Sequence, residues 1–147
     1  MKIDIREVAF ASEEYKSLLK IRYDVLRKPL GTELSAKDIE ADDKEFHVAV
    51  FDGANAIACV LLRPINADII KLRQMAVTDA CQGQGIGAKL VLHAEELAAS
   101  RGFKTMELHA RKFAQGFYEK LGYATEGEEF IEATVPNIKM FKSLEIA

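Results

Sequence analysis

Apolar and polar positions change their spacing several times along the chain, and each change marks a predicted element. Alternation, as in the apolar Ile3 and Ile5 of KIDIREV, is typical of a half-buried strand. It predicts strands over 2–8, 46–51, 56–65, 68–77, 104–110, 123–133 and 136–144. Apolar residues three and four apart predict helices that run from Ser12 towards Pro29, over 86–101 and over 112–121. In the last helix we expect Phe113, Phe117 and Leu121 to face inward.

The connections between these elements carry their own signals. Asp52-Gly53 between two apolar runs predicts a hairpin of antiparallel strands. The strand over 68–77 follows closely enough to pair antiparallel with its predecessor. Six acids and two lysines occupy 33–45 without a clear period, so we interpret this run as a loop with a short helical turn. Such a run is either a solvated face or a rim that attracts cations.

The stretch 71–88, KLRQMAVTDACQGQGIGA, joins an apolar strand to a helix through alternating glycines. Gly83, Gly85 and Gly87 have no Cβ atoms that would keep a ligand away from the main chain. The helix that they open adds unpaired N–H groups and the positive end of its dipole. The turn is therefore interpreted as a cradle for phosphate or pyrophosphate; the alternative is a tight strand-to-helix turn without a ligand.

The order of the elements discriminates between two kinds of phosphate ligand. Gly83, Gly85 and Ala88 also fit the dinucleotide pattern G-x-G-x-x-G/A, with Glu107 near the spacing of a ribose-binding acid. A Rossmann half, however, carries its glycine turn after the first strand of a βαβαβ run. Here a long, mostly antiparallel pattern precedes the turn, and one right-handed crossover follows it. The order predicts an α/β domain of the α+β, three-layer type with one βαβ unit, and NAD or FAD becomes a remote alternative.

Size and charge narrow the class further. The 147 residues are enough for one domain with a single core, so we expect one domain over 1–147. A net charge of −3 argues against a nucleic-acid partner, and no apolar stretch reaches the length of a membrane span. Two cysteines outside any C-x-x-C pair and three histidines without metal-ligand spacing predict a reduced, cytoplasmic protein that holds no metal.

Two motifs resemble those of the GNAT superfamily of acyl-CoA-dependent N-acetyltransferases. The run 82–87, QGQGIG, is similar to the acyl-CoA signature Q/R-x-x-G-x-G/A, and a strand that ends in Met75-Ala76-Val77 precedes it as in the family. The run 114–123, AQGFYEKLGY, is similar to the segment A-x-x-F-Y-x-K-x-G-F/Y. The closing stretch 127–140 most resembles small uncharacterised bacterial members. In one departure, Arg111 stands seven residues before the tyrosine, where many members carry asparagine.

The resemblance implies a GNAT-like mixed, mostly antiparallel sheet with helices on both faces, and acetyl-CoA as the acetyl donor. The pyrophosphate would lie on the main-chain N–H groups of 82–88, and the pantetheine would pair with Met75 and Val77 like an added strand. The Met75 N–H would stabilise the tetrahedral oxyanion, and the Tyr118 hydroxyl would act as acid to the departing thiolate. The residues implied to bind the cofactor are Met75, Ala76, Val77, Gln82, Gly83, Gln84, Gly85, Ile86, Gly87, Ala88, Arg111, Ala114, Phe117 and Tyr118.

The sequence indicates the acceptor amine and the general base less specifically than it indicates the cofactor site. A neutral amine nitrogen must attack, so a carboxylate, a histidine or a chain of water has to take up a proton. The acidic stretches 33–45 and 126–132 favour a cationic acceptor, either a small-molecule amine or a lysine or N-terminal amine. The candidates for base or acceptor contact are Asp42, Asp43, His47, His109, Glu128 and Glu132; a core histidine is the alternative for His47.

Three classes of function follow from this sequence. The first is an N-acetyltransferase that moves an acetyl group from acetyl-CoA to a primary amine by direct attack in a ternary complex. The second is a module that binds or senses CoA without turnover, and the remote third is a dinucleotide enzyme. Strand edges near the C-terminal end could pair two copies, and members of the superfamily are often dimers.

Overall fold

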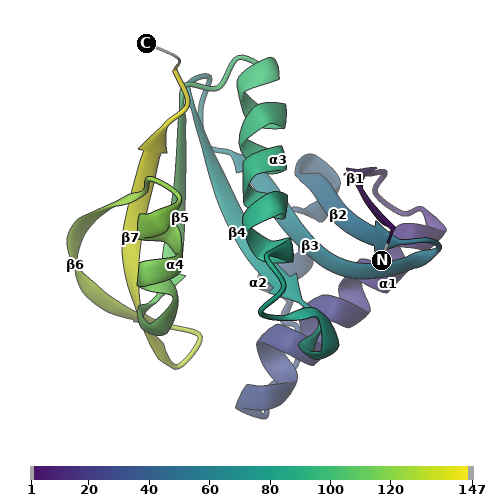
Figure 1. Cartoon of the computed structure of the whole chain (residues 1–147). Helices are drawn as coiled ribbons and strands as arrows, with labels where there is room; N and C mark the ends of the chain where they lie inside the picture. Colours follow the sequence, from purple (N-terminus) through teal and green to yellow (C-terminus); the bar gives the residue numbers. More distant parts are fainter. Residues whose placement is uncertain (1, 146–147) are drawn as a thin grey trace. The chain divides into compact units, whose positions relative to one another are not determined.

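The computed structural model describes residues 2–145 as strands and helices in the predicted order (Figure 1). The strands are β1 (Ile3–Val8), β2 (Phe46–Asp52), β3 (Asn55–Pro64), β4 (Ile69–Val77), β5 (Thr105–Arg111), β6 (Ala124–Glu132) and β7 (Val135–Ser143). The helices are α1 (Glu13–Arg22), α2 (Ala36–Ile39), α3 (Ile86–Ser100) and α4 (Gln115–Lys120). The contacts group these elements into two compact units, one of 2–63 with 74–94 and one of 64–73 with 95–145.

The strands form a mixed sheet of seven in the hydrogen-bonded order β1-β2-β3-β4-β5-β7-β6. The pairs β1-β2, β2-β3, β5-β7 and β6-β7 are antiparallel, and β4 runs parallel to β5 from Ile69 opposite Thr105 to Leu72 opposite Leu108. Because α3 connects the parallel pair, the βαβ unit lies where the sequence predicted it. The predicted fold class, an α/β domain with a mixed and mostly antiparallel sheet, is confirmed.

In the first unit, the apolar face of α1 packs against strands. Tyr15, Leu18 and Ile21 of α1 share one buried cluster with side chains of four strands. These strand residues are Val8, Ala49, Phe51, Cys59 and Ala76. The helix begins where the sequence predicted it, and Ser12 is its N-cap, because the Ser12 hydroxyl accepts a hydrogen bond from the Tyr15 N–H at 3.2 Å. Helix α1 is thus fixed at its start by its cap and along its length by the cluster.

The acid-rich run 33–45 folds as the short helix α2 and a 3₁₀ turn, Asp42–Lys44. The interpretation of this run as a solvated face is wrong for three of its acids, because each meets an arginine from another element. The ion pairs are Arg27–Asp38 at 2.8 Å, Arg22–Asp42 at 2.6 Å and Arg63–Glu45 at 2.7 Å. Because these carboxylates are paired with arginines and shielded from water, the negative electrostatic potential that they create in the solvent is weak. Asp43, in contrast, is exposed.

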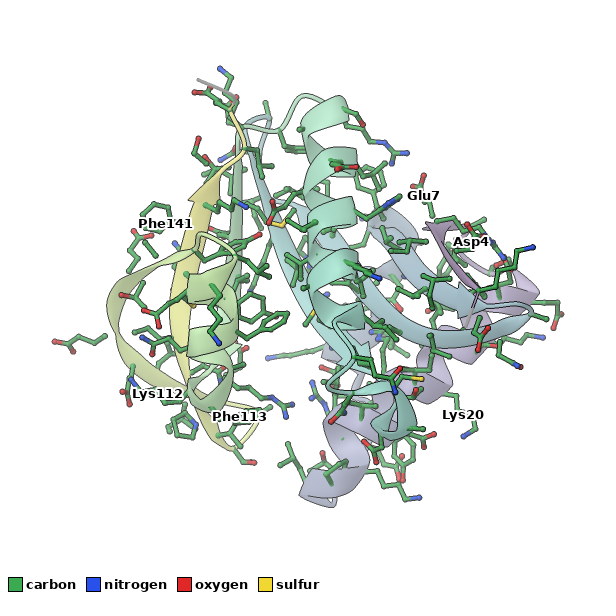
Figure 2. All side chains as sticks on the ribbon, viewed as in Figure 1. Asp4, Glu7, Lys20, Lys112, Phe113 and Phe141 are labelled. Carbon is green, nitrogen blue, oxygen red and sulfur yellow. The ribbon has the colours of Figure 1, made fainter. Side chains whose placement is uncertain are left out.

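In the second unit, β7 lies between β5 and β6, and α4 follows β5 (Figure 1). The prediction for the inward face of α4 is wrong at Phe113, which is 84% exposed (Figure 2). The reason is local: residues Lys112–Ala114 form a 3₁₀ turn, so the α-helical spacing that would align Phe113 with Phe117 does not apply. Tyr118 and Tyr123 are the buried aromatic residues of this segment instead.

Candidate functional site

The glycine turn connects β4 to α3 as an exposed loop between two buried anchors. Residues 82–85 are exposed, whereas Cys81 before them and Ile86 after them are buried. Gly83 and Gly85 have φ angles of 78° and 79°, a left-handed conformation that other residues adopt only at a cost. A Cβ added at either glycine would meet no protein atom within 4 Å. The glycines are therefore required by the main-chain conformation, and the space over them is open.

The turn is held in shape by its own side chains. The Gln82 amide donates to Val77 O at 3.0 Å and to Asp79 Oδ1 at 3.3 Å, and the Gln84 amide donates to Ala80 O at 3.2 Å. These bonds occupy side-chain donors and leave most of the main chain of the turn for a ligand. Gln82 N is the exception, because it approaches Asp79 O at 3.4 Å within the 3₁₀ turn Asp79–Cys81.

The start of α3 offers a row of N–H groups. Lys89 N donates to Gly85 O at 3.2 Å, which makes Gly85 the first acceptor of the helix. The N–H groups of Ile86, Gly87 and Ala88 precede this bond, so helix geometry gives them no acceptor within α3. Together with the helix dipole they offer donors of the kind that the predicted anion site requires. The geometry fits a pyrophosphate, which would bridge several of these donors.

The second motif lies in the other unit and is centred on Tyr118. Its side chain is 7% exposed and its ring contacts those of Phe117 and Tyr123, with centroids 5.0 Å and 5.7 Å away. Burial raises the pKa of Tyr118 above its ordinary value, so the hydroxyl is neutral and carries its proton at physiological pH. Ala114 and Phe117 are half-buried beside it in the chain, and Arg111 ends β5.

Of the six candidates for base or acceptor contact, Asp42 and His47 belong to the core of the first unit. Asp42 is fully buried and accepts from Arg22 Nη1 at 2.6 Å and from the Tyr15 hydroxyl at 2.5 Å. His47 is 1% exposed, and its Nε2 lies 2.7 Å from Asp42 O. Neither side chain has an open face for an acceptor amine, so their expected contact with substrate is replaced by a structural role. Asp43 remains exposed on the same turn.

The second unit brings two other candidates together. His109 Nδ1 lies 2.9 Å from Glu132 Oε2, and the His109 ring stacks edge-on against Phe130. The hydrogen bond with His109 lowers the pKa of Glu132, and it outweighs the opposing effect of burial. Lys71 Nζ lies 3.3 Å from the same His109 nitrogen, so the ring's tautomer decides which neighbour is hydrogen-bonded. Glu128, on β6, is exposed.

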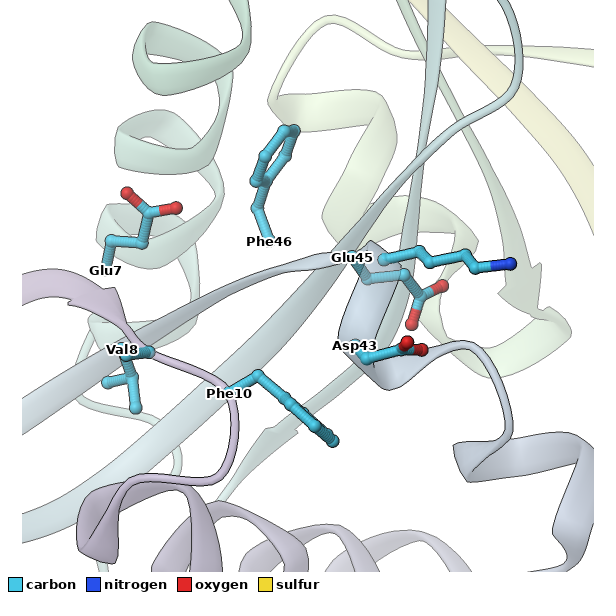
Figure 3. A pocket seen from close by; sticks show the side chains of 8 residues that line it. Glu7, Val8, Phe10, Asp43, Glu45 and Phe46 are labelled. Carbon is cyan, nitrogen blue, oxygen red and sulfur yellow. The ribbon is translucent and has the colours of Figure 1, made fainter.

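A shallow pocket in the first unit was not predicted from the sequence (Figure 3). Its lining comes from the end of β1, the start of β2 and the turn before it, and includes Val8, Phe10, Asp43 and Phe46. Val8 pairs with His47 and Phe46 with Leu62, whereas the chain leaves β4 for the glycine turn beside Ile57, at the other end of β3. The pocket therefore lies at the opposite end of these strands from the glycine turn.

Sequence reasoning also missed a buried polar network around Gln74. Gln74 lies in β4 with a φ of 49°, and its side-chain amide contacts Arg22 and Asp38. One signal was available in the sequence: an arginine at position 22 falls within the apolar stripe of the first helix. A buried arginine needs a partner, and the acid-rich run was the source of that partner.

Residues 2–145 also bear on metal binding and on membrane insertion. No group of three or more His, Cys, Asp or Glu side chains in this part of the chain could hold a metal ion. None of the helices described here is long and apolar enough to cross a membrane.

The fold and the glycine turn define a class of protein, a mixed α/β domain in which a glycine-rich turn leads into a helix N-terminus. The chain belongs to the Acetyltransferase (GNAT) family, whose sequence pattern matches residues 12–123. The N-acetyltransferase YitI of Bacillus subtilis (strain 168), named as uncharacterised, is 30% identical over 132 residues, which is 85% of this chain and 89% of YitI. The motifs that indicated the family in the sequence are thereby supported over most of the chain.

Solved structures support the same fold. A protein from Lactobacillus plantarum superposes with a TM-score of 0.89 at 24% identity, over 99% of this chain and 100% of its own. An aminoglycoside 6'-N-acetyltransferase, solved in complex with coenzyme A, superposes with a TM-score of 0.81 at 20% identity, over 98% of each chain. At these identities the likeness establishes the architecture.

Proposed function

We propose that the chain is an N-acetyltransferase that transfers an acetyl group from acetyl-CoA to a primary amine. The observation that carries the proposal is the glycine turn with the free N–H groups at the start of α3. This turn lies where the segment that resembles the family's acyl-CoA signature falls in the sequence. The structural neighbour solved in complex with coenzyme A, an aminoglycoside 6'-N-acetyltransferase, supports the choice of ligand.

In the proposed reaction, the amine nitrogen bonds to the acetyl carbon while the bond from that carbon to sulfur breaks. The Met75 N–H donates to the acetyl oxygen, on which negative charge develops. The Tyr118 hydroxyl donates to the sulfur as it leaves. Because its pKa lies above that of a thiol, Tyr118 stabilises the thiolate mainly through a hydrogen bond, and complete proton transfer would be uphill.

For the general base we propose His109 with Glu132. When the Glu132 carboxylate accepts from the His109 Nδ1–H, the lone pair is on Nε2, which can then take a proton from an ammonium group. The 2.9 Å contact between these residues supports the pair over isolated acids such as Glu128. The cationic acceptor inferred from acidic runs loses support, because Asp38, Asp42 and Glu45 are paired with arginines.

The test compares two glycines of the first unit by thermal unfolding with and without acetyl-CoA. Gly85 and Gly53 both have a left-handed φ, 79° and 61°, and both have open space where a Cβ would be added. Replacement by alanine should therefore destabilise each protein similarly, by about 1 kcal/mol. Only Gly85→Ala should lose acetyl-CoA affinity, roughly tenfold to a hundredfold, as expected for one charge-assisted hydrogen bond.

The controls separate the three classes of function. Acetyl-CoA should raise the melting temperature of the unaltered protein, and NADH at the same concentration should not. An increase with NADH alone would favour the dinucleotide alternative and contradict the proposal. Binding of acetyl-CoA without any release of free thiol across a broad panel of amines would favour a CoA-sensing module.

A further inference from the structure

Gln74 carries a main-chain conformation that is unusual for its residue type. Its φ of 49° lies in the left-handed region, inside strand β4 and directly before Met75. A residue with a Cβ adopts this region at a cost, and such positions persist only where the surroundings fix them. Neither glycine nor asparagine occupies the position. The contacts of the glutamine side chain can help to fix this conformation.

Both ends of the Gln74 amide are engaged by fixed partners. Its Oε1 accepts from Arg22 Nε at 2.6 Å, and its Nε2 donates to Asp38 Oδ1 at 3.1 Å. An amide that accepts from one side and donates to the other has one orientation that satisfies both bonds. The Gln74 amide is thus fixed at both of its polar atoms.

The partners are themselves immobilised. Arg22 is 1% exposed, and its remaining donors go to Asp42 Oδ2 at 2.6 Å and to Asp38 O at 2.7 Å. The Asp38 carboxylate is held by Arg27 at 2.8 Å and by the N–H of Ser35 at 2.8 Å. Two elements, α1 through Arg22 and α2 through Asp38, therefore meet at the Gln74 amide, and the 3₁₀ turn Asp42–Lys44 supports them through the contact of Asp42 with Arg22.

We propose that Gln74 is a positioning residue, whose amide lock with Arg22 and Asp38 aims the Met75 N–H at the acetyl oxygen. The inference rests on the proposed function. The peptide between Gln74 and Met75 carries that N–H, and its direction is set by the main-chain angles of Gln74. A donor aimed in advance stabilises developing charge without reorganisation. The two hydrogen bonds of the Gln74 amide orient the Met75 N–H, while Gln74 itself does not touch the reacting atoms.

The test uses two variants and a pair of ligands. Gln74→Leu keeps the bulk of the side chain but removes both hydrogen bonds. Gln74→Gly also removes them, and it relieves the steric cost of the left-handed φ. Acetyl-CoA and CoA share their pyrophosphate and pantetheine and differ in the acetyl group, so their difference in affinity reports the Met75 contact. Affinities come from thermal shifts, and turnover comes from the release of free thiol.

We expect the unaltered protein to bind acetyl-CoA more tightly than CoA. Both variants should lose this preference and keep their affinity for CoA within about twofold, so their affinity for acetyl-CoA should fall to that for CoA. Accordingly, kcat should fall roughly tenfold or more, and KM for acetyl-CoA should rise only by the factor of the lost preference. A role limited to stability would lower the melting temperature and leave preference and kcat intact, which would overturn the inference. Full activity of Gln74→Gly would also overturn it, because the left-handed conformation without the amide would then suffice.

Failure of the proposed function has a different appearance. If neither acetyl-CoA nor CoA raises the melting temperature of the unaltered protein, the proposed acetyltransferase function is contradicted, and the positioning role of Gln74 is contradicted with it. Variants that behave like an active unaltered protein contradict only the positioning role.

Discussion

At the scale of single residues, the buried charges of the first unit carry the most stringent requirements. Arg22 and Asp42 form an ion pair that is almost completely removed from water, with side chains 1% and 0% exposed. The cost of removing both charges from water is offset by their attraction and by the extra bonds to Tyr15, Gln74 and Asp38. Loss of one partner leaves the other as an uncompensated buried charge.

Adjacent acids therefore should respond very differently to truncation. Asp42→Ala is expected to reduce the free energy of unfolding by about 3–5 kcal/mol, because it leaves the Arg22 guanidinium buried without its counter-charge. Asp43→Ala is the matched control and should change stability by less than about 0.5 kcal/mol, since its side chain is exposed. Urea unfolding of both variants measures the difference. Equal and small effects would show that the pair is not buried in solution.

A second residue-scale prediction concerns two buried tyrosines of the second unit. Tyr118→Phe should lower kcat by about a hundredfold and leave the dissociation constant of CoA unchanged, since it removes only the proposed donor to the leaving sulfur. Tyr123→Phe removes a hydroxyl that donates to Glu95 at 2.9 Å, so it should cost about 1 kcal/mol of stability and leave kcat intact. Thiol-release kinetics measure the expected loss of kcat in Tyr118→Phe, and urea unfolding measures the expected loss of stability in Tyr123→Phe. Equal losses of kcat and of CoA affinity in Tyr118→Phe would count against its proposed role.

The sequence could not distinguish such neighbours. Asp42 and Asp43 are the same residue type in one acid-rich run, and only the fold decides which of them meets Arg22. His47 raised the same difficulty, because the sequence of a strand does not show whether a histidine ring nitrogen will be hydrogen-bonded to a main-chain carbonyl, as His47 is to Asp42 O. Tyr118 became a candidate catalytic residue only through its motif, since its spacing from Phe113 and Phe117 indicated a core aromatic.

At the scale of elements, local patterns were sufficient wherever the structure is local. The start of the first helix at Ser12, the hairpin at Asp52-Gly53 and the start of α3 after the glycine turn all depend on a few consecutive residues, and all three are confirmed. The prediction that Phe113 faces inward was wrong because a 3₁₀ turn before α4 changes the angular spacing of the side chains. The network around Gln74 was missed because it joins residues more than thirty positions apart.

The short helix α2 should give stability a distinct pH dependence through Asp38. Burial alone would raise the pKa of Asp38, but hydrogen bonds from Arg27 and Ser35 outweigh it and hold the pKa below its ordinary value of 3.8. A carboxyl whose pKa is lowered by folding stabilises the native state above the unfolded pKa. That contribution is lost as the pH falls through the folded value.

Asp38→Asn keeps the acceptor oxygen near Gln74 and removes the charge. The variant should be less stable than the unaltered protein at pH 7, and the gap between them should narrow as the pH falls below about 4. Free energies of unfolding from urea titrations at several pH values measure the gap. A gap that stays constant down to pH 2 would mean that the carboxylate contributes no charge-dependent stability.

At the scale of the whole molecule, the two units share a strand and a helix, β4 and α3. The glycine turn belongs to the first unit, and so does Cys59, a core thiol that is 2% exposed. Burial raises the pKa of Cys59 to about 12, and a thiol must be both exposed and ionised to react. In the native protein Cys59 is therefore inert, and its modification reports opening of the first unit.

This thiol can show whether the cradle and the core of the first unit open together. In a Cys81→Ala background, which leaves Cys59 as the single thiol, the labelling rate is proportional to the open fraction when closing is fast. If opening destroys the cradle, acetyl-CoA at a hundred times its dissociation constant should slow labelling by roughly a hundredfold. NADH should have no effect. An unchanged labelling rate beside a raised melting temperature would mean that Cys59 becomes exposed through a local opening that leaves the glycine turn intact, since a ligand can oppose only those openings that release it.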